Sequence, residues 1–374
     1  MKTVILTCST GQGHNSAALA VREALEERGA VCEVRDALAF LGDNVSDAIT
    51  GAFVNIAVKT PRAFGFMYAA GEFIRSDKRK SPVYFANALY AENLRRYLEE
   101  EEVDAAVCPH LFPAEALTYL KRKHALPARC YYVSTDYACI PFLEETDMDV
   151  VFTPHADLSG QFVRRGIRPE RLFPTGIPVR NEYLSSQDRA DARALLDLPA
   201  GLPCYLVMTG GEGCGDAGTL TKKLLERLKS RDARIVVLTG RNAALRESLE
   251  TRFGEDVRVH AVAFTERVPL YMDACDVLLT KPGGISSTEA AVKGIPIVHT
   301  PPIPGVETLN AQFFAERGMS ILAPTEDSAA ENAIRLAGDA EQCARMLAAQ
   351  RQYLVRGAAE RIAAHIFEGK PPAE

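Results

Sequence analysis

The chain has 374 residues, of which 47% are hydrophobic and 25% are charged. This is the composition of an ordinary soluble globular protein, and it excludes collagen, coiled coil and extended disorder. The formal net charge of −6 argues against a general nucleic-acid binder, so we expect no nucleic-acid partner. At roughly 100–200 residues per domain, the length predicts two domains.

Short apolar segments alternate with segments of helical periodicity along the whole chain. The expected strands are apolar on both faces, as in parallel sheets that are covered by helices. They are Thr3–Cys8, Ala105–Cys108, Cys130–Ser134, Val150–Thr153, Tyr205–Thr209, Ile235–Thr239, Val277–Thr280 and Pro296–Thr300. Helical periodicity is clear in Ser16–Glu27 and Leu220–Ser230. The predicted fold class is therefore α/β, with Rossmann-like sheets.

The alternation of strands and helices starts afresh after the Pro/Gly-rich stretch Pro174–Arg180. We therefore place one Rossmann-like domain at 1–178 and a second at 179–345. The C-terminal helical segment, 346–374, is expected to pack back on the N-terminal domain. Ligands of open parallel sheets bind at the carboxyl ends of the strands, so two such domains facing each other would form a cleft with a ligand on each wall.

The cysteines and the apolar runs bear on localisation. Nine cysteines are scattered without a CxxC pair, which predicts reduced thiols and no disulfide framework or structural zinc site. The longest uncharged runs, such as 48–58, fall short of the ~18–20 residues of a spanning helix. The first residues lead directly into a strand, so no signal peptide is expected. These features predict a cytoplasmic protein.

The segment 9–16 (STGQGHNS) follows the first strand and opens a helix. Its glycines, Gly11 and Gly13, permit a tight turn, and the free amides of a helix start favour an anion or a polar ligand. A dinucleotide is not supported, because Ser16 stands where the fingerprint needs a third glycine. His14 lies where the helix dipole disfavours its cationic form, which suits a neutral base. The alternative is an incidental histidine in a capping turn.

Two further segments follow strands in the second half. In 209–215 (TGGEGCG), four glycines leave backbone amides open to a pyrophosphate, although a plain turn is the alternative. In 281–290 (KPGGISSTEA), a glycine turn and a hydroxyl-rich helix start suit a phosphate, and Glu289 is close enough to accept from ribose hydroxyls. Glu307 and Asn310, one helical turn apart, suit sugar hydroxyls. Here the alternative is a helix cap and an ordinary proline loop.

These segments carry a resemblance to a known family. The stretch 281–318 (KPGGISSTEAAVKGIPIVHTPPIPGVETLNAQFFAERG) resembles the nucleotide-sugar signature of GT-B glycosyltransferases. With 10–17 (TGQGHNSA) and 133–179, it resembles the monogalactosyldiacylglycerol synthases and processive diacylglycerol glucosyltransferases over nearly the whole chain. The resemblance implies a GT-B fold, two Rossmann-like domains facing across a cleft. It also implies inverting, metal-independent transfer of a hexose from a UDP-sugar to diacylglycerol or a glycosyl-diacylglycerol, without a cofactor.

The resemblance also implies roles for individual residues. On the acceptor side, His14 would be the base or would position the acceptor, beside Gly11, Gly13, Thr135 and Asp136. The residues implied for the UDP-sugar are Gly211, Glu212, Gly213 and Gly215 in a phosphate loop, Phe264 at the uracil, Gly283 and Gly284 in the glycine turn, Ser286 and Ser287 at the diphosphate, Glu289 at the ribose, and Glu307 and Asn310 at the sugar. The first loop reads Gln12-Gly13 where plant members have more glycine, which leaves the acceptor open.

Other interpretations stay open alongside this one. The same architecture serves isomerases that resemble UDP-N-acetylglucosamine 2-epimerase, and a non-catalytic nucleotide-sugar-binding protein would share the donor residues. The sequence does not choose among glucose, galactose and N-acetylglucosamine. Asp147-Met148-Asp149 has the Asp-x-Asp form of metal-dependent transferases, but it precedes its strand, so we interpret it as a turn. Backbone amides and helix dipoles would then neutralise the leaving diphosphate.

The segment 59–85 mixes basic and aromatic residues. This mixture suits an anionic membrane surface, although a helix with a solvated charged end is the alternative. The candidate membrane residues are Arg62, Phe64, Phe66, Phe73, Arg75, Lys78, Arg79 and Lys80. We expect reversible, salt-sensitive, peripheral association with the inner face of the cell membrane.

Overall fold

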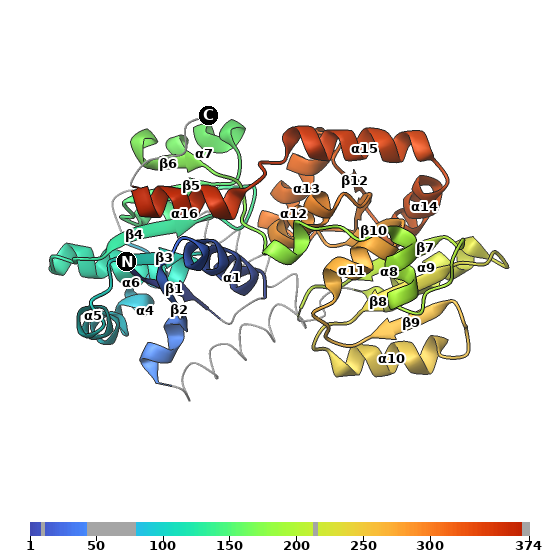
Figure 1. Cartoon of the computed structure of the whole chain (residues 1–374), viewed down its shortest axis with the longest axis horizontal. Coiled ribbons are helices and arrows are strands. Elements are labelled where there is room, and N and C mark those ends of the chain that lie inside the picture. Colours follow the sequence, from blue (N-terminus) through green and yellow to red (C-terminus); the bar gives the residue numbers. More distant parts are fainter. Residues whose placement is uncertain (9–11, 43–79, 212–215, 369–374) are drawn as a thin grey trace. The chain divides into compact units, whose positions relative to one another are not determined.

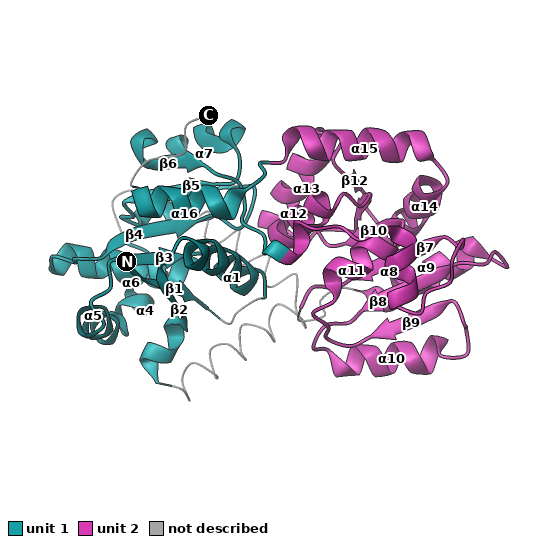
Figure 2. Cartoon of the chain, in the orientation of Figure 1, with its two compact units in different colours: residues 1–181, 355–374 teal, residues 182–354 magenta. Residues whose placement is uncertain are grey.

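The computed structural model describes residues 1–8, 12–42, 80–211 and 216–368 (Figure 1). The chain consists of two compact units (Figure 2). Unit 1 comprises Met1–Asn181 and Val355–Glu374, and unit 2 comprises Glu182–Leu354. Each unit contains its own six-stranded sheet, and every strand pair in both sheets is parallel. The α/β fold class predicted from the alternating segments is confirmed.

The sheet of unit 1 has the strand order β2-β1-β3-β4-β5-β6. Its strands are β1 (Lys2–Thr7), β2 (Val31–Asp36), β3 (Ala105–Cys108), β4 (Arg129–Val133), β5 (Val150–Thr153) and β6 (Leu172–Pro174). Its helices are α1 (Gln12–Glu27), α4 (Pro82–Ala88), α5 (Ala91–Glu100), α6 (Leu111–Lys123), α7 (Ser159–Arg164) and α16 (Ala358–Glu368). Ile5 of β1 lies opposite Val34 of β2 and Val107 of β3, which fixes the register.

Successive side chains of β1 enter two different cores, as the two-residue period of a strand requires. Val4 and Leu6 pack with the buried faces of α5 and α6. Ile5 packs on the opposite side of the sheet with α1 and with Ile362 and Ile366 of α16. The sheet is therefore covered on both faces, and this is why its strands read as continuous apolar runs.

The sheet of unit 2 has the strand order β12-β11-β10-β7-β8-β9. Its strands are β7 (Cys204–Met208), β8 (Arg234–Leu238), β9 (Val259–Val262), β10 (Val277–Thr280), β11 (Ile297–His299) and β12 (Ile321–Leu322). Its helices are α8 (Arg189–Leu195), α9 (Ala217–Leu228), α10 (Ala243–Phe253), α11 (Val268–Ala274), α12 (Gly284–Lys293), α13 (Val306–Glu316), α14 (Glu326–Ala337) and α15 (Ala340–Tyr353). One core joins Tyr205 and Val207 of β7 to α9 and α14.

The units change at 181/182 and at 354/355, whereas the sequence analysis placed the boundaries at 178/179 and 345/346. The larger difference arises because α15 continues unbroken through position 346 and belongs to unit 2. A short break follows at 354–357, where Gly357 has a φ of 66°, a left-handed conformation that suits glycine. The C-terminal helical residues, 340–353 and 358–368, are thus two helices in different units. Among the described residues, no helix has both the length and the apolar character needed to cross a bilayer.

Each sheet has one point at which its strand order reverses. In unit 1 this point lies between β1 and β3, and in unit 2 it lies between β7 and β10. At such a point the loops after neighbouring strands diverge and leave room for a ligand at the carboxyl ends. The two candidate half-sites are therefore the carboxyl ends of β1 and β3 in unit 1, and of β7 and β10 in unit 2.

Candidate active site

In unit 1, the reversal point gathers three polar groups around His14. His14 lies in the first turn of α1, and its Nδ1 atom is 2.9 Å from the carbonyl oxygen of Pro109, which follows β3. The hydroxyl of Thr135, which follows β4, is 3.3 Å from the same nitrogen. The structure therefore brings together the two predicted acceptor-side residues His14 and Thr135.

The contact with Pro109 fixes the form of the His14 imidazole. A carbonyl oxygen accepts hydrogen bonds and cannot donate them, so Nδ1 must carry the hydrogen. In the neutral ring the lone pair then lies on Nε2. His14 thus has the tautomer of a general base that acts through Nε2.

His110 packs beside His14, at the start of α6. The two rings meet edge to face, with centroids 4.6 Å apart and an interplanar angle of 82°. The Nδ1 atom of His110 accepts the backbone N–H of Phe112 at 3.1 Å and so caps the helix. His110 is buried, and His14 is partly buried.

Burial lowers the pKa of His14, while the negative charge of Asp136 and the hydrogen bond to Pro109 act in the opposite direction. Burial also lowers the pKa of His110 well below its ordinary value, and a positive charge on His14 lowers it further. Two adjacent imidazolium ions would repel each other. The pair is therefore neutral near pH 7, with Asp136 placed to stabilise a proton that His14 gains.

Helix α1 is held against the sheet by small residues and by one polar contact. Ala17, Ala18 and Ala20 are buried on its inner face, which lets the helix backbone lie close to the strands. The hydroxyl of Thr7, at the end of β1, donates to Oδ1 of Asn15 at 2.8 Å. Asn15 is the neighbour of His14, so this contact fixes the turn that carries the imidazole. Gly13 lies in the same turn, and Gly11 lies outside the described residues.

In unit 2, the segment after β10 meets α13. The ammonium of Lys281 donates to Oε1 of Glu307 at 2.6 Å, and the N–H of Ile303 donates to Oε2 at 2.9 Å. The amide of Asn310 is fully buried and donates to the carbonyl oxygen of Pro282 at 3.1 Å. The structure thus brings Glu307 and Asn310 to the loop that contains Gly283 and opens α12 at Gly284.

The two serines at the start of α12 have different surroundings. Ser287 is fully buried, and its hydroxyl lies 3.0 Å from Nε2 of His299, whose Nδ1 is 3.0 Å from the hydroxyl of Ser320. Ser286 is partly exposed at the same helix start. Ser286 is therefore the more accessible hydroxyl for a ligand. Glu289 is buried on the same helix.

The remaining residues that were predicted to bind the donor follow β7 and β9. Gly211 follows β7, and its carbonyl oxygen accepts the N–H of Arg241 at 2.9 Å. Phe264 follows β9 and is half-exposed, and the Arg241 guanidinium lies over its ring, 4.9 Å from the centroid. Glu212, Gly213 and Gly215 lie outside the described residues.

Of the predicted membrane residues, Lys80 lies within the described part of the chain. Its ammonium donates to the carbonyl oxygen of Glu145 and lies 5.1 Å from the centre of the Tyr84 ring. The other members of the set lie outside the described residues; they are Arg62, Phe64, Phe66, Phe73, Arg75, Lys78 and Arg79.

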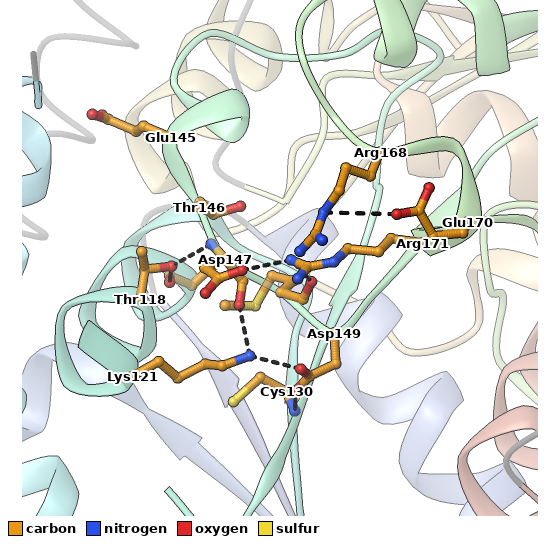
Figure 3. Close-up of polar contacts among 12 residues, drawn as sticks. Thr118, Lys121, Cys130, Glu145, Thr146, Asp147, Asp149, Arg168, Glu170 and Arg171 are labelled. Atoms are coloured by element: carbon orange, nitrogen blue, oxygen red, sulfur yellow. Dashed lines mark hydrogen bonds and ion pairs between the residues drawn. The ribbon is translucent and has the colours of Figure 1, made fainter. Parts of the chain in front are cut away.

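The Asp-x-Asp segment lies in the connection between the 3-10 helix Leu143–Glu145 and β5, before its strand as the sequence indicated (Figure 3). Asp147 receives a hydrogen bond from Arg171 at 2.5 Å. Asp149 bonds Lys121 at 2.7 Å and the backbone N–H of Cys130 at 2.8 Å. These contacts tie α6, β4 and the segment before β6 together, so both carboxylates have basic partners within unit 1.

The sequence analysis assigned no role to several residues that shape these half-sites. Pro109 and His110 contact His14, and Lys281 contacts Glu307. Each follows a predicted strand directly or within two residues. Their position at a strand end was a usable signal, but their partners come from distant segments, and single-sequence spacing does not reveal such pairings.

Comparison with solved structures defines the class of fold. MurG of Acinetobacter baumannii has a TM-score of 0.63 at 16% identity, covering 98% of this chain and 99% of that chain. The UDP-N-acetylglucosamine 2-epimerase from Neisseria meningitidis, bound to UDP-GlcNAc, has a TM-score of 0.65 at 15% identity, and the match covers 98% of this chain and 100% of that chain. The chain has the GT-B fold, which confirms that prediction; likeness at this identity shows the fold alone.

Sequence comparison narrows the class to a family. The family model described as monogalactosyldiacylglycerol (MGDG) synthase matches residues 14–179. Processive diacylglycerol beta-glucosyltransferase of Bacillus subtilis is 25% identical over 349 residues, 92% of this chain and 89% of that protein. Probable monogalactosyldiacylglycerol synthase 2, chloroplastic, of Oryza sativa subsp. indica is 25% identical over 350 residues, which are 89% of this chain and 72% of that protein. The chain is similar to the monogalactosyldiacylglycerol synthases and processive diacylglycerol glucosyltransferases over most of its length, and this is the resemblance that its motifs indicated.

Proposed function

We propose that this protein is an inverting glycosyltransferase that moves a hexose from a UDP-sugar to a hydroxyl of diacylglycerol or of a glycosyl-diacylglycerol. The observation that carries the proposal is the state of His14, a neutral imidazole whose Nδ1–H is committed to Pro109 at 2.9 Å. Its Nε2 is left as the basic atom, at the reversal point of the sheet where ligands bind. Similarity to diacylglycerol glycosyltransferases supports the substrate class.

In this mechanism, Nε2 of His14 takes the proton of the acceptor hydroxyl. The acceptor oxygen attacks the anomeric carbon, and the bond from that carbon to the diphosphate breaks on the opposite face. The bonding electrons leave with UDP, so a single displacement inverts the anomeric centre. The imidazolium that forms keeps its bond to Pro109 and lies in the field of Asp136, which raises the proton affinity of the ring.

On the donor side, we assign Phe264 to the uracil, Glu289 to the ribose, and Glu307 with Asn310 to the sugar. Ser286 and the backbone amides of Gly211 and Gly284 are assigned to the diphosphate. Gly283 is assigned to the turn before α12, because its N–H donates to the carbonyl oxygen of Lys281 at 2.9 Å. Ser287 is assigned to the support of this loop through His299, because its hydroxyl is fully buried. We propose that the transfer needs no metal ion or cofactor, since these groups would stabilise the leaving diphosphate electrostatically.

We also propose peripheral association with an anionic membrane surface at the cytoplasmic face. Phe85 on α4 and Leu89 one turn later are 60% and 76% exposed. The neighbouring helix α6, which packs against α4, ends with the exposed residues Arg122 and Lys123. Exposed apolar side chains beside basic ones are typical of surfaces that enter the headgroup region of a bilayer.

The test is UDP release from a panel of UDP-sugars, with and without diacylglycerol in anionic vesicles. The proposal requires release that depends on the lipid with at least one sugar, together with a glycolipid product. Conversion of the donor to its epimer without lipid would instead establish an isomerase. Stoichiometric UDP-sugar binding with no turnover under any condition would establish a binding protein.

A further inference from the structure

This inference rests on the proposed function and concerns Lys281, the first residue after β10. The strand order of unit 2 reverses between β7 and β10, so Lys281 stands at the reversal point where an open sheet binds its ligand. Its side chain lies between the loop that follows β7 and helix α13. This is a place where a fixed positive charge could act on a bound anion.

Gly210, in the loop after β7, lies beside the lysine. A Cβ atom on Gly210 would lie 3.4 Å from Cε of Lys281, at an ordinary van der Waals distance. Gly210 also has a φ of 75°, which favours glycine on its own account. The lysine chain therefore lies across the loop that follows β7.

The far end of the lysine is held by Glu307 of α13. The ammonium donates to Oε1 at 2.6 Å, and Oε2 of the same carboxylate accepts the N–H of Ile303 at 2.9 Å, so the carboxylate is itself fixed. The Lys281 side chain is 28% exposed and that of Glu307 is 11% exposed. An ammonium has three N–H donors, and the bond to Glu307 orients the charge.

Lys281 is one of two basic residues near the carboxyl ends of the central strands in the described part of unit 2. Within three residues of the carboxyl ends of β7, β8 and β10, the basic residues of the described chain are Arg241 and Lys281. The Arg241 guanidinium lies over Phe264, on the side assigned to the uracil. Lys281 lies against Glu307, on the side assigned to the sugar. Of the two phosphates, the one next to Lys281 is therefore the β-phosphate, which carries the sugar.

We propose that Lys281 binds the β-phosphate of the nucleoside diphosphate donor and stabilises it as the leaving group. When the bond from the anomeric carbon to the β-phosphate oxygen breaks, the electron pair stays on that oxygen. The ammonium next to it offsets the added negative charge, and Glu307 positions the ammonium while it faces the sugar hydroxyls. Sugar recognition and leaving-group stabilisation would thus share one ion pair.

The experiment measures the binding of UDP and UMP to the full chain by isothermal titration calorimetry. Lys281→Met removes the charge and keeps the length of the side chain, and Lys281→Arg keeps the charge. Lys222→Met, on the exposed face of α9, is the matched control. Because a charge-assisted hydrogen bond to phosphate is lost, Lys281→Met should weaken UDP binding by about 10–100-fold. UMP lacks the β-phosphate, so its affinity should change by less than about twofold.

The outcomes separate this inference from the proposed function. If the wild-type chain binds UDP and Lys281→Met binds it equally well, the role of Lys281 is refuted and the proposed function stands. An equal loss of UDP and UMP affinity would refute the assignment to the β-phosphate. If the wild-type chain binds neither nucleotide, the proposed UDP-sugar donor is itself refuted. Retention of at least a third of the wild-type UDP affinity by Lys281→Arg would support the need for a cation.

Discussion

Nδ1 of His14 lies 2.9 Å from the carbonyl oxygen of Pro109, a residue 95 positions away in the sequence. The loop after β3 thereby sets the tautomer of a residue on α1. The same loop supplies His110, whose ring meets that of His14 at 4.6 Å between centroids. The reactivity of His14 is therefore determined as much by the segment 109–110 as by its own turn.

His14→Ala tests the base directly. Removal of a general base lowers turnover by ~10²-fold or more, while UDP affinity should stay within about twofold because the assigned UDP residues are in unit 2. Turnover and UDP binding are measured on the same preparations. His260→Ala, an exposed histidine on β9, is the control. A matching loss of UDP affinity in His14→Ala would place His14 on the donor side and contradict the assignment.

The pH dependence of the reaction should report the state of His14. Burial lowers its pKa, and a base acts in its neutral form, so the acid limb of kcat/KM should have its midpoint below the ordinary value of about 6.5. His110→Asn keeps a side chain that can cap α6 but lets water reach His14. Its midpoint should therefore move upward. An acid limb at the same pH in both proteins would show that His110 does not control the base.

Ser286 and Ser287 form a matched pair for separating binding from stability. Ser287→Ala removes a buried hydrogen bond and leaves a nitrogen of His299 without that partner, which should cost about 1–3 kcal/mol of unfolding free energy. Ser286→Ala should leave the unfolding free energy unchanged and raise the KM for the UDP-sugar. Chemical denaturation and donor kinetics of both variants decide the point. The reverse pattern would assign Ser287, not Ser286, to the diphosphate.

Glu115 of α6 gives unit 1 a pH-dependent stability. Burial and the negative charge of Glu145 raise the pKa of Glu115 to about 10. In the folded chain Glu115 therefore keeps its proton. In the unfolded chain the carboxyl loses it above its ordinary pKa of about 4.5. Stability should fall as the pH rises from about 4.5 towards 10, and Glu115→Gln should flatten this slope. Thermal unfolding from pH 5 to pH 9 measures it, and a slope unchanged in the variant would contradict the assignment.

The apolar pair on α4 tests the proposed membrane contact. Phe85→Ser combined with Leu89→Ser should reduce sedimentation with anionic vesicles by about tenfold or more, because burial of such side chains contributes roughly 1.5–3 kcal/mol each. Val257→Ser, at an apolar residue that is 81% exposed in unit 2, is the control. Turnover with a short-chain, water-dispersed acceptor should be unaffected. Equal sedimentation of all three proteins would rule out this surface.

The regular parts of both units could be predicted from the sequence because their strands are buried on both faces. Runs such as those of β1, β7 and β10 need no knowledge of their neighbours to be recognised. The strand ends that carry Gly11, His14 and Ser286 were visible for the same reason. What could not be predicted is pairing at long range. Ser287 looks like Ser286 until His299 is placed beside it, and α15 and α16 look like one helix because Leu354 and Val355 continue the apolar pattern across the break.

Because residues 355–374 belong to unit 1, that unit cannot be completed until unit 2 has been synthesised. Unit 2 is encoded by one continuous stretch, Glu182–Leu354, and has all its strands once that stretch is made. Unit 1 begins to be made first, but the face of its sheet around Ile5 is covered by α1 without α16 until Ile362 and Ile366 are made. The segment synthesised first is therefore completed last. On a ribosome, the part of that apolar face that α16 covers would remain open to chaperones throughout the synthesis of unit 2.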